Sequence, residues 1–283
     1  MPTSRLAVDL SSGTLRVLEG MPGGPMRCGE AAAPPGSLEG GRVLDPTALG
    51  QALRQLIART EITTARALIA VSDALASFRV LTFPNSATDA EIDTAVQSQL
   101  NLGSDRMSVL HREVLAGRDE VTVFATLWDR VAVQAIAAVA RQAGLEPAVV
   151  DLKSLCVARA IVDDSCIVLD LSVDPCEALL IDERLPRIWH TIKLESGGDL
   201  ALTVANGLKP MLSFHRRSGG TGFGPDSPIL IRSDQSLPSL LTTRLDQLTG
   251  HPVNPLAQPR RVDPDVRHGA YLTCLGLAMR RSV

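Results

Sequence analysis

The sequence has little net charge and no cysteine pairs, and each absence excludes a class of protein. Its 28 Lys and Arg and 31 Asp and Glu residues leave a formal net charge of −3. The chain as a whole therefore has no electrostatic attraction for nucleic acid or anionic lipid. Its five cysteines are odd in number and form no Cys-x-x-Cys pair. This usage favours reduced core cysteines in a cytoplasm over a disulfide framework.

Long apolar runs are missing as well. The first residues contain no apolar signal core. The most apolar predicted helix, residues 131–140, has about half of the roughly 20 residues that are needed to cross a bilayer. We expect a cytoplasmic protein, peripheral to a membrane only through a partner.

Patterns for metal or hydrolytic chemistry are also absent. The histidines lack metal-ligand spacing, and no Gly-x-Ser-x-Gly elbow is present. The glycine-rich segment 219–224 precedes a predicted strand, whereas phosphate-binding loops follow a strand and open a helix. We interpret this segment as the flexible remnant of a missing subdomain, within an irregular stretch, residues 209–226.

What the sequence does contain is one short pattern, written twice. Residues 6–10 and 15–18 predict two buried strands joined by a turn of small residues, and Asp9 lies where the first strand meets the turn. The pattern returns at residues 166–172, with Asp170 near the strand end and Ser172 just beyond, and continues to Ile181. We interpret the two copies as duplicated hairpins that would face each other across a cleft.

Between and after the hairpins, apolar periodicity and capping residues predict alternating helices and strands. The expected helices cover residues 46–57, 88–100, 129–143, 152–161, 237–249 and 269–281, and another follows Gly197 and Gly198. The expected strands cover residues 67–71, 78–83, 108–115, 121–127, 148–150 and 228–231.

In order and spacing, these motifs resemble those of the actin-like ATPase superfamily. Within it they look most like the PilM-like proteins of type IV pilus assembly, which are related to FtsA. The matching segments are a first phosphate motif (9–19), the entry to a 1C-type insertion (81–84), the return from it (150–159), a second phosphate motif (170–172) and a closing helix (276–280). The resemblance covers nearly the whole chain.

The resemblance implies an α/β protein with a two-lobed actin-like (ribonuclease H-like) fold. Residues 1–83 would form the first part of lobe IA, 84–146 an inserted 1C-like subdomain, and 147–165 the return to lobe IA. Residues 166–267 would form lobe II, and 268–283 the closing helix. The segment between Gly198 and Ile229 is too short for a full 2B cap, so the cap of lobe II would be reduced.

The resemblance also implies a nucleotide cleft, which we expect to be vestigial. Its residues in this chain would be Asp9, Ser11, Ser12, Gly13, Thr14, Arg16, Asp170, Ser172, Gly197 and Gly198. The family has glycine where this chain has Ser11 and Ser172, and a Cβ hinders the close approach of backbone N–H groups to phosphate. The family's adenosine loop, usually Gly-Gly, aligns with Ser233 and Asp234, and the added negative charge disfavours a polyphosphate.

Two interpretations of the paired aspartates stay open. Asp9 and Asp170 would hold Mg²⁺ through water molecules if ATP is bound. Alternatively, each accepts hydrogen bonds from turn amides, as strand-end aspartates commonly do. Because both glycines are lost, we favour the second interpretation and expect a pseudo-ATPase with no catalytic residues, rather than an enzyme that uses ATP and Mg²⁺.

The expected function is that of a scaffold of a type IV pilus or a related secretion machine. The resemblance implies that such proteins bind the cytoplasmic N-terminal tail of an inner-membrane partner (PilN-like) in a groove between lobe IA and 1C. Here the strand 78–83, the helix 88–100 and the strand 121–127 would supply that groove. An active Mg·ATP-dependent ATPase of pilus assembly or cell division is the alternative, and a small-molecule kinase on the same fold is a third. Whether the protein forms homo-oligomers stays open.

Overall fold

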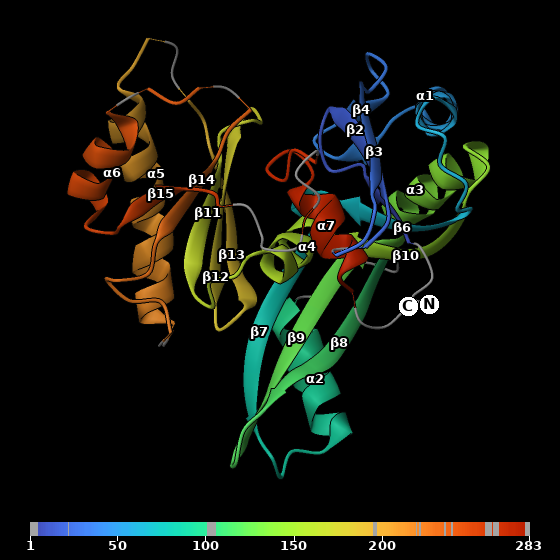
Figure 1. Ribbon diagram of the computed structural model, residues 1–283. Coiled ribbons are helices and arrows are strands. Elements are labelled where there is room, and N and C mark those ends of the chain that lie inside the picture. The colour runs from blue at the N-terminus through green and yellow to red at the C-terminus, as the bar shows by residue number, and fades with distance from the viewer. Residues whose placement is uncertain are drawn as a thin grey trace. The chain divides into compact units, whose positions relative to one another are not determined.

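The structure is a computed structural model, which describes residues 5–21, 23–100, 106–194, 197–218, 220, 222–234, 236–238, 240–257, 262 and 266–280. The chain forms two compact units. The N-terminal unit comprises Val8–Val17 and Gly29–Leu152, and the C-terminal unit comprises Met1–Ala7, Leu18–Cys28 and Lys153–Val283. Figure 1 labels the helices and strands. Among the described residues, no helix is both long and apolar enough to span a bilayer.

The first strands of the chain belong to a five-stranded sheet with the strand order β10-β6-β1-β2-β3. Its strands are β1 (Leu6–Asp9), β2 (Thr14–Glu19), β3 (Arg27–Ala32), β6 (Arg66–Val71) and β10 (Glu146–Leu152). β10 runs parallel to β6. The strands β1 and β6 read as nearly continuous apolar runs because most of their side chains are buried. The expected first hairpin is confirmed, and β3 forms an edge of this sheet.

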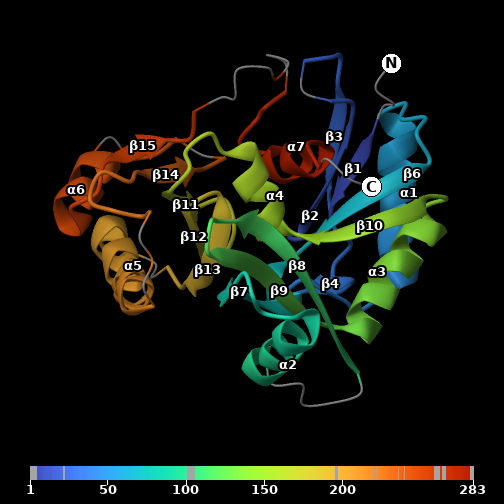
Figure 2. The same cartoon turned by 90° about the horizontal axis from the view of Figure 1, so that it is seen from below.

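Helices α1 (Pro46–Arg59) and α3 (Arg130–Gln142) pack against each other beside this sheet (Figure 2). Asp45 caps α1 by accepting hydrogen bonds from the backbone N–H groups of Thr47 and Ala48, both at 3.0 Å. The close crossing requires Gly50, because a Cβ there would lie 2.4 Å from the side chain of Gln142. Short elements complete this part: β4 (Leu38–Glu39), β5 (Arg42–Val43) and the 3₁₀ helix η1 (Asp73–Leu75).

A three-stranded antiparallel sheet in the order β7-β9-β8 also belongs to the N-terminal unit. Its strands are β7 (Ala76–Pro84), β8 (Met107–Ala116) and β9 (Glu120–Asp129), and α2 (Asp89–Leu100) covers one face (Figure 2). The apolar side chains of α2 pack on alternate residues of β9, as half-buried strands require. A capping box opens α2. Thr88 N donates to the Glu91 carboxylate at 2.8 Å, and Glu91 N donates to Thr88 Oγ1 at 3.3 Å.

The C-terminal unit is built on a sheet in the order β13-β12-β11-β14-β15. Its strands are β11 (Cys166–Asp170), β12 (Cys176–Asp182), β13 (Leu185–Ile192), β14 (Ile229–Arg232) and β15 (Val253–Pro255). One face packs against α5 (Leu200–Arg217) and α6 (Leu241–Thr249), and the other against α4 (Lys153–Ala160) and α7 (Leu272–Ala278) (Figure 1). Alternate residues of β11 enter the two apolar cores, so the strand is buried on both faces.

One expectation about this unit is wrong. The stretch 209–226 is not irregular from its start, because α5 continues to Arg217 with Pro210 inside the helix. Asp199 caps α5, and its buried face continues past the proline to Met211 and His215, so packing outweighs the lost backbone hydrogen bond. In the glycine-rich segment, Gly219 and Thr221 lie outside the described residues.

Candidate functional site

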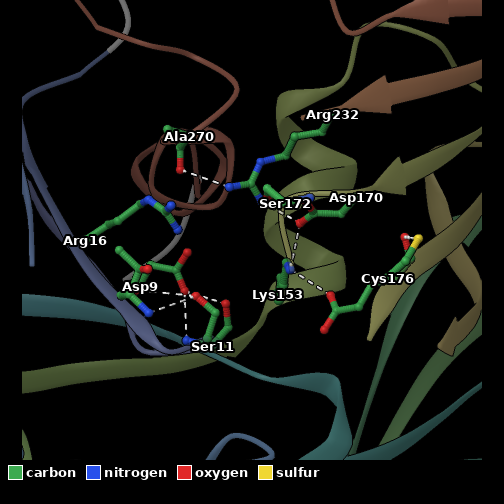
Figure 3. Close-up of polar contacts among 12 residues, drawn as sticks. Asp9, Ser11, Arg16, Lys153, Asp170, Ser172, Cys176, Arg232 and Ala270 are labelled. Carbon is green, nitrogen blue, oxygen red and sulfur yellow. Dashed lines mark hydrogen bonds and ion pairs between the residues drawn. The ribbon is translucent and has the colours of Figure 1, made fainter. Parts of the chain in front are cut away.

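The first hairpin holds Asp9 through Ser11. Asp9 is buried at the end of β1, and its Oδ1 atom accepts hydrogen bonds from the Ser11 backbone N–H at 2.9 Å and the Ser11 hydroxyl at 2.6 Å (Figure 3). The turn continues with a contact of 3.4 Å between Ser12 Oγ and the Thr14 backbone N–H. Gly13 has open space where a Cβ would stand.

Arg16 follows on β2 and is directed into an ion pair. Its Nε lies 3.2 Å from Glu30 Oε2 on β3, and the Arg16 side chain is buried. The backbone carbonyl of Glu30 in turn accepts a hydrogen bond from Arg59 at the end of α1, at 2.8 Å. The arginine that the sequence aligned with a phosphate-binding position thus helps to attach β3 to β2.

The second hairpin repeats the local arrangement of the first. Asp170, the last residue of β11, accepts hydrogen bonds on Oδ1 from the Ser172 backbone N–H at 3.1 Å and from the Ser172 hydroxyl at 2.5 Å. In both hairpins the serine two residues after the aspartate bonds it twice, with the hydroxyl as the second donor. Both serines therefore orient an aspartate side chain.

The second hairpin differs from the first in the cations that meet its aspartate. Asp170 Oδ2 lies 3.1 Å from Lys153 Nζ at the start of α4 and 2.5 Å from an Arg232 NH group at the end of β14 (Figure 3). Lys153 Nζ also lies 2.7 Å from Glu177 Oε2 on β12. We call Lys153, Asp170, Glu177 and Arg232 the Asp170 charge cluster. Its two positive and two negative charges balance.

Because the cluster is buried, its ion pairs determine the pKa values of Asp170 and Lys153. Burial alone would raise the pKa of Asp170, but the charges of Lys153 and Arg232 outweigh it and lower that pKa to about 2. Burial alone would lower the pKa of Lys153, but the carboxylates of Asp170 and Glu177 raise it above its ordinary value. Asp170 and Lys153 are therefore both charged at neutral pH.

Gly197 and Gly198 lie in the turn before α5. Gly197 adopts a φ of 77°, which glycine takes up without strain. Asp199 then caps the helix by accepting a hydrogen bond from Leu202 N at 3.3 Å. Of the predicted cleft residues, those from Asp9 to Arg16 belong to the N-terminal unit, and Asp170, Ser172 and the two glycines belong to the C-terminal unit.

Sequence reasoning missed the roles of Lys153 and Arg232. A signal was present for each. Lys153 opens the helix that directly follows β10, and Arg232 ends the apolar run of β14. A single cation at such a position needs a buried anion. Among the described residues, no group of three or more His, Cys, Asp or Glu side chains is placed to hold a metal ion.

No protein-family model matches the chain, and no curated protein matches it in sequence. A solved PilM–PilN type IV pilus biogenesis complex matches 99% of this chain and 98% of the other, with a TM-score of 0.71 and 18% identity.

Two further structures also match almost completely. One is the cytoplasmic domain of EpsL, an inner-membrane component of the type II secretion system of Vibrio cholerae, with 99% and 97% of the two chains covered, a TM-score of 0.56 and 12% identity. The other is a protein with an actin-like ATPase fold from Bacteroides thetaiotaomicron, with 96% of each chain covered, a TM-score of 0.50 and 12% identity.

The chain has the actin-like fold. The fold that the resemblance implied is therefore confirmed. The nucleotide that the resemblance implied would bring a Mg²⁺ ion to Asp170, and Asp170 does not fit this role. Both of its oxygens already have partners: Ser172 donates twice to Oδ1, and two cations contact Oδ2. A divalent cation there would be repelled by Lys153 and Arg232.

Proposed function

We propose that the protein is a cytoplasmic scaffold of a type IV pilus or related secretion machine. In this role it binds the cytoplasmic N-terminal tail of an inner-membrane partner, and its binding of ATP is weak or lost. The observation that carries the proposal is the likeness to the PilM–PilN complex along the whole chain. The likeness to the cytoplasmic domain of an inner-membrane secretion component agrees with it.

We assign tail recognition to the three-stranded sheet β7-β9-β8 with α2, which includes most of the expected 1C-like subdomain (84–146). β7 pairs with β9 and is an edge strand of the three-stranded sheet. An edge strand offers backbone N–H and C=O groups with which an extended peptide can pair, and side-chain pockets then give selectivity. Val80, in the middle of β7, is only partly buried and offers apolar contact to such a peptide, whereas Leu81 packs against the apolar cluster of α2 and β9.

The charge cluster supports the second half of the proposal. An actin-like ATPase needs a carboxylate that can order water around Mg²⁺. Asp170 is instead paired with Lys153 and Arg232. The active ATPase is the rival function, and it predicts a specific gain of stability with Mg·ATP.

A proline scan of β7 tests the tail site. Successive amides of an edge strand point alternately toward β9 and away from it. Of Arg79→Pro and Val80→Pro, one removes a hydrogen bond to β9 and the other removes an outward N–H. The outward variant should keep its melting temperature within a few degrees and bind a fluorescent tail peptide at least about tenfold more weakly, a loss of about 1.4 kcal/mol.

Matched prolines at Leu110 and His111 on β8, the opposite edge, are the controls, and they should leave tail affinity unchanged where they fold. A scrambled peptide of the same composition controls for charge. If no tail peptide binds at about 100 µM, a concentration that detects weak complexes, the proposed function is refuted. Equal loss from both edges would refute the β7 assignment.

A further inference from the structure

We infer that Lys153 and Arg232 replace a divalent cation at Asp170, so that the second hairpin is complete without metal or nucleotide. The inference deepens the proposed function. Its regulatory consequence, which rests on that function, is that tail binding is constitutive and is not switched by ATP. It starts from the disagreement between the fold's implied Mg²⁺ and the side chains that surround Asp170.

The sheet register creates the need for a cation at this position. Asp170 pairs with Glu177 across the antiparallel strands β11 and β12, and with Arg232 across the parallel strands β11 and β14. Two carboxylates directly opposite each other in an antiparallel pair repel. Lys153 Nζ contacts both of them, at 3.1 Å from Asp170 and 2.7 Å from Glu177. The lysine therefore resolves a repulsion that the strand register imposes.

Arg232 extends the cluster to the last helix. One of its NH groups contacts Asp170 at 2.5 Å, and the other donates to the Ala270 carbonyl at 3.4 Å, just before α7 (Figure 3). Lys153 is also the first residue of the C-terminal unit after Leu152 of β10. The cluster thus joins α4, β11, β12, β14 and the turn before α7 around one carboxylate.

The charge balance of the cluster argues against an added metal ion. Lys153, Asp170 and Arg232 are almost fully buried, so little water screens them. Two cations and two anions already neutralise each other, and a Mg²⁺ ion would leave two uncompensated positive charges. Removing Lys153 alone would make the cluster favourable for a divalent cation. It leaves Asp170 and Glu177 as adjacent acceptors, with Arg232 as the one remaining cation of the cluster.

Metal binding by the full chain tests the inference, with Mn²⁺ as the paramagnetic probe for Mg²⁺. In the wild type, the free Mn²⁺ EPR signal should show no site that Asp170→Asn removes. Lys153→Met should bind Mn²⁺ at least about tenfold more tightly than the wild type, and about 10 mM MgCl₂ should raise its melting temperature. The double variant Lys153→Met/Asp170→Asn is the matched control and should lose both gains.

A wild-type Mn²⁺ site that depends on Asp170 would overturn the inference. So would a Lys153→Met protein that matches the wild type in stability and ignores divalent cations. If Lys153→Met does not fold, Arg232→Met is the second variant, and it should also bind Mn²⁺ more tightly than the wild type. The comparison of the wild type with Asp170→Asn depends on neither methionine variant.

Tail-peptide anisotropy with and without Mg·ATP tests the regulatory consequence. The two affinities should agree within about twofold, less than 0.5 kcal/mol. An ATP-dependent affinity would refute the inference and leave tail binding intact. Absence of tail binding would refute the proposed function, whereas the Mn²⁺ result would stand by itself.

Discussion

Replacing Asp170 by asparagine separates the two interpretations of this residue by the sign of its effect on stability. If Asp170 completes a buried ion cluster, Asp170→Asn removes the carboxylate that faces both Lys153 and Arg232. Glu177 is then the one remaining anion of the cluster against two buried cations. If Asp170 were instead an idle metal ligand, its removal would relieve repulsion from Glu177 and would leave stability unchanged or raised.

The structure sets the size of the expected loss. Removing one partner of a buried ion pair costs about 3–5 kcal/mol, because the other charge remains buried without compensation. Asp170 contacts two cations, and an asparagine retains the acceptor for Ser172. We therefore expect Asp170→Asn to lower the free energy of unfolding by about 4 kcal/mol. In a chain of this size that corresponds to a fall in melting temperature of roughly 8–16 °C.

Urea unfolding and thermal unfolding of the wild type, Asp170→Asn and Asp9→Asn measure this difference. Asp9→Asn is the matched control, because Asp9 has the same place in the first hairpin and Asn keeps the acceptor for Ser11. It should cost about 1 kcal/mol. Equal stability of Asp170→Asn and the wild type, without divalent cations in either sample, would refute the reasoning.

Two further predictions concern packing and pH. Gly276→Ala should destabilise the protein by at least about 3 kcal/mol, because its Cβ would lie 1.7 Å from the Cys156 carbonyl oxygen. Gly269→Ala is the control and should be nearly neutral, because a Cβ there has open space. Equal melting temperatures of the two variants would show that α4 and α7 do not cross this closely. Burial lowers the pKa of His215 below its ordinary 6.5, so the unfolded chain takes up this proton more readily. The stability that His215 contributes is therefore complete above about pH 6.5 and is lost as the pH falls toward the lower folded-state pKa. The His215→Gln variant should show a shallower loss between pH 8 and pH 5.5 in urea unfolding, and an unchanged slope would contradict this assignment.

Local signals predicted much of the fold because they depend on neighbouring residues alone. The capping box at Thr88 and Glu91, the proline opening α1 and the left-handed Gly250 after α6 all occur where the sequence places them. The two hairpins could be recognised in the sequence because each carries an apolar run, an aspartate and a serine within seven residues.

What the sequence could not reveal depends on tertiary contacts. Pro210 predicts a helix end, yet the buried face of α5 outweighs it. The role of Lys153 was hidden because its partners, Asp170 and Glu177, are brought to it by the packing of α4 on a sheet whose register no local pattern fixes. The short edge strand β15 carries too few residues for a period to be read.

Thermal unfolding of the wild type with and without Mg·ATP tests the central claim most directly. We predict a change of less than about 1 °C, because a ligand stabilises a protein only through binding to the folded state. At 100 times its dissociation constant, a bound nucleotide would contribute about 2.7 kcal/mol, or roughly 5–11 °C. A rise of that size that disappears in Asp9→Ala would contradict the account and show that the chain binds Mg·ATP, as the rival ATPase function requires.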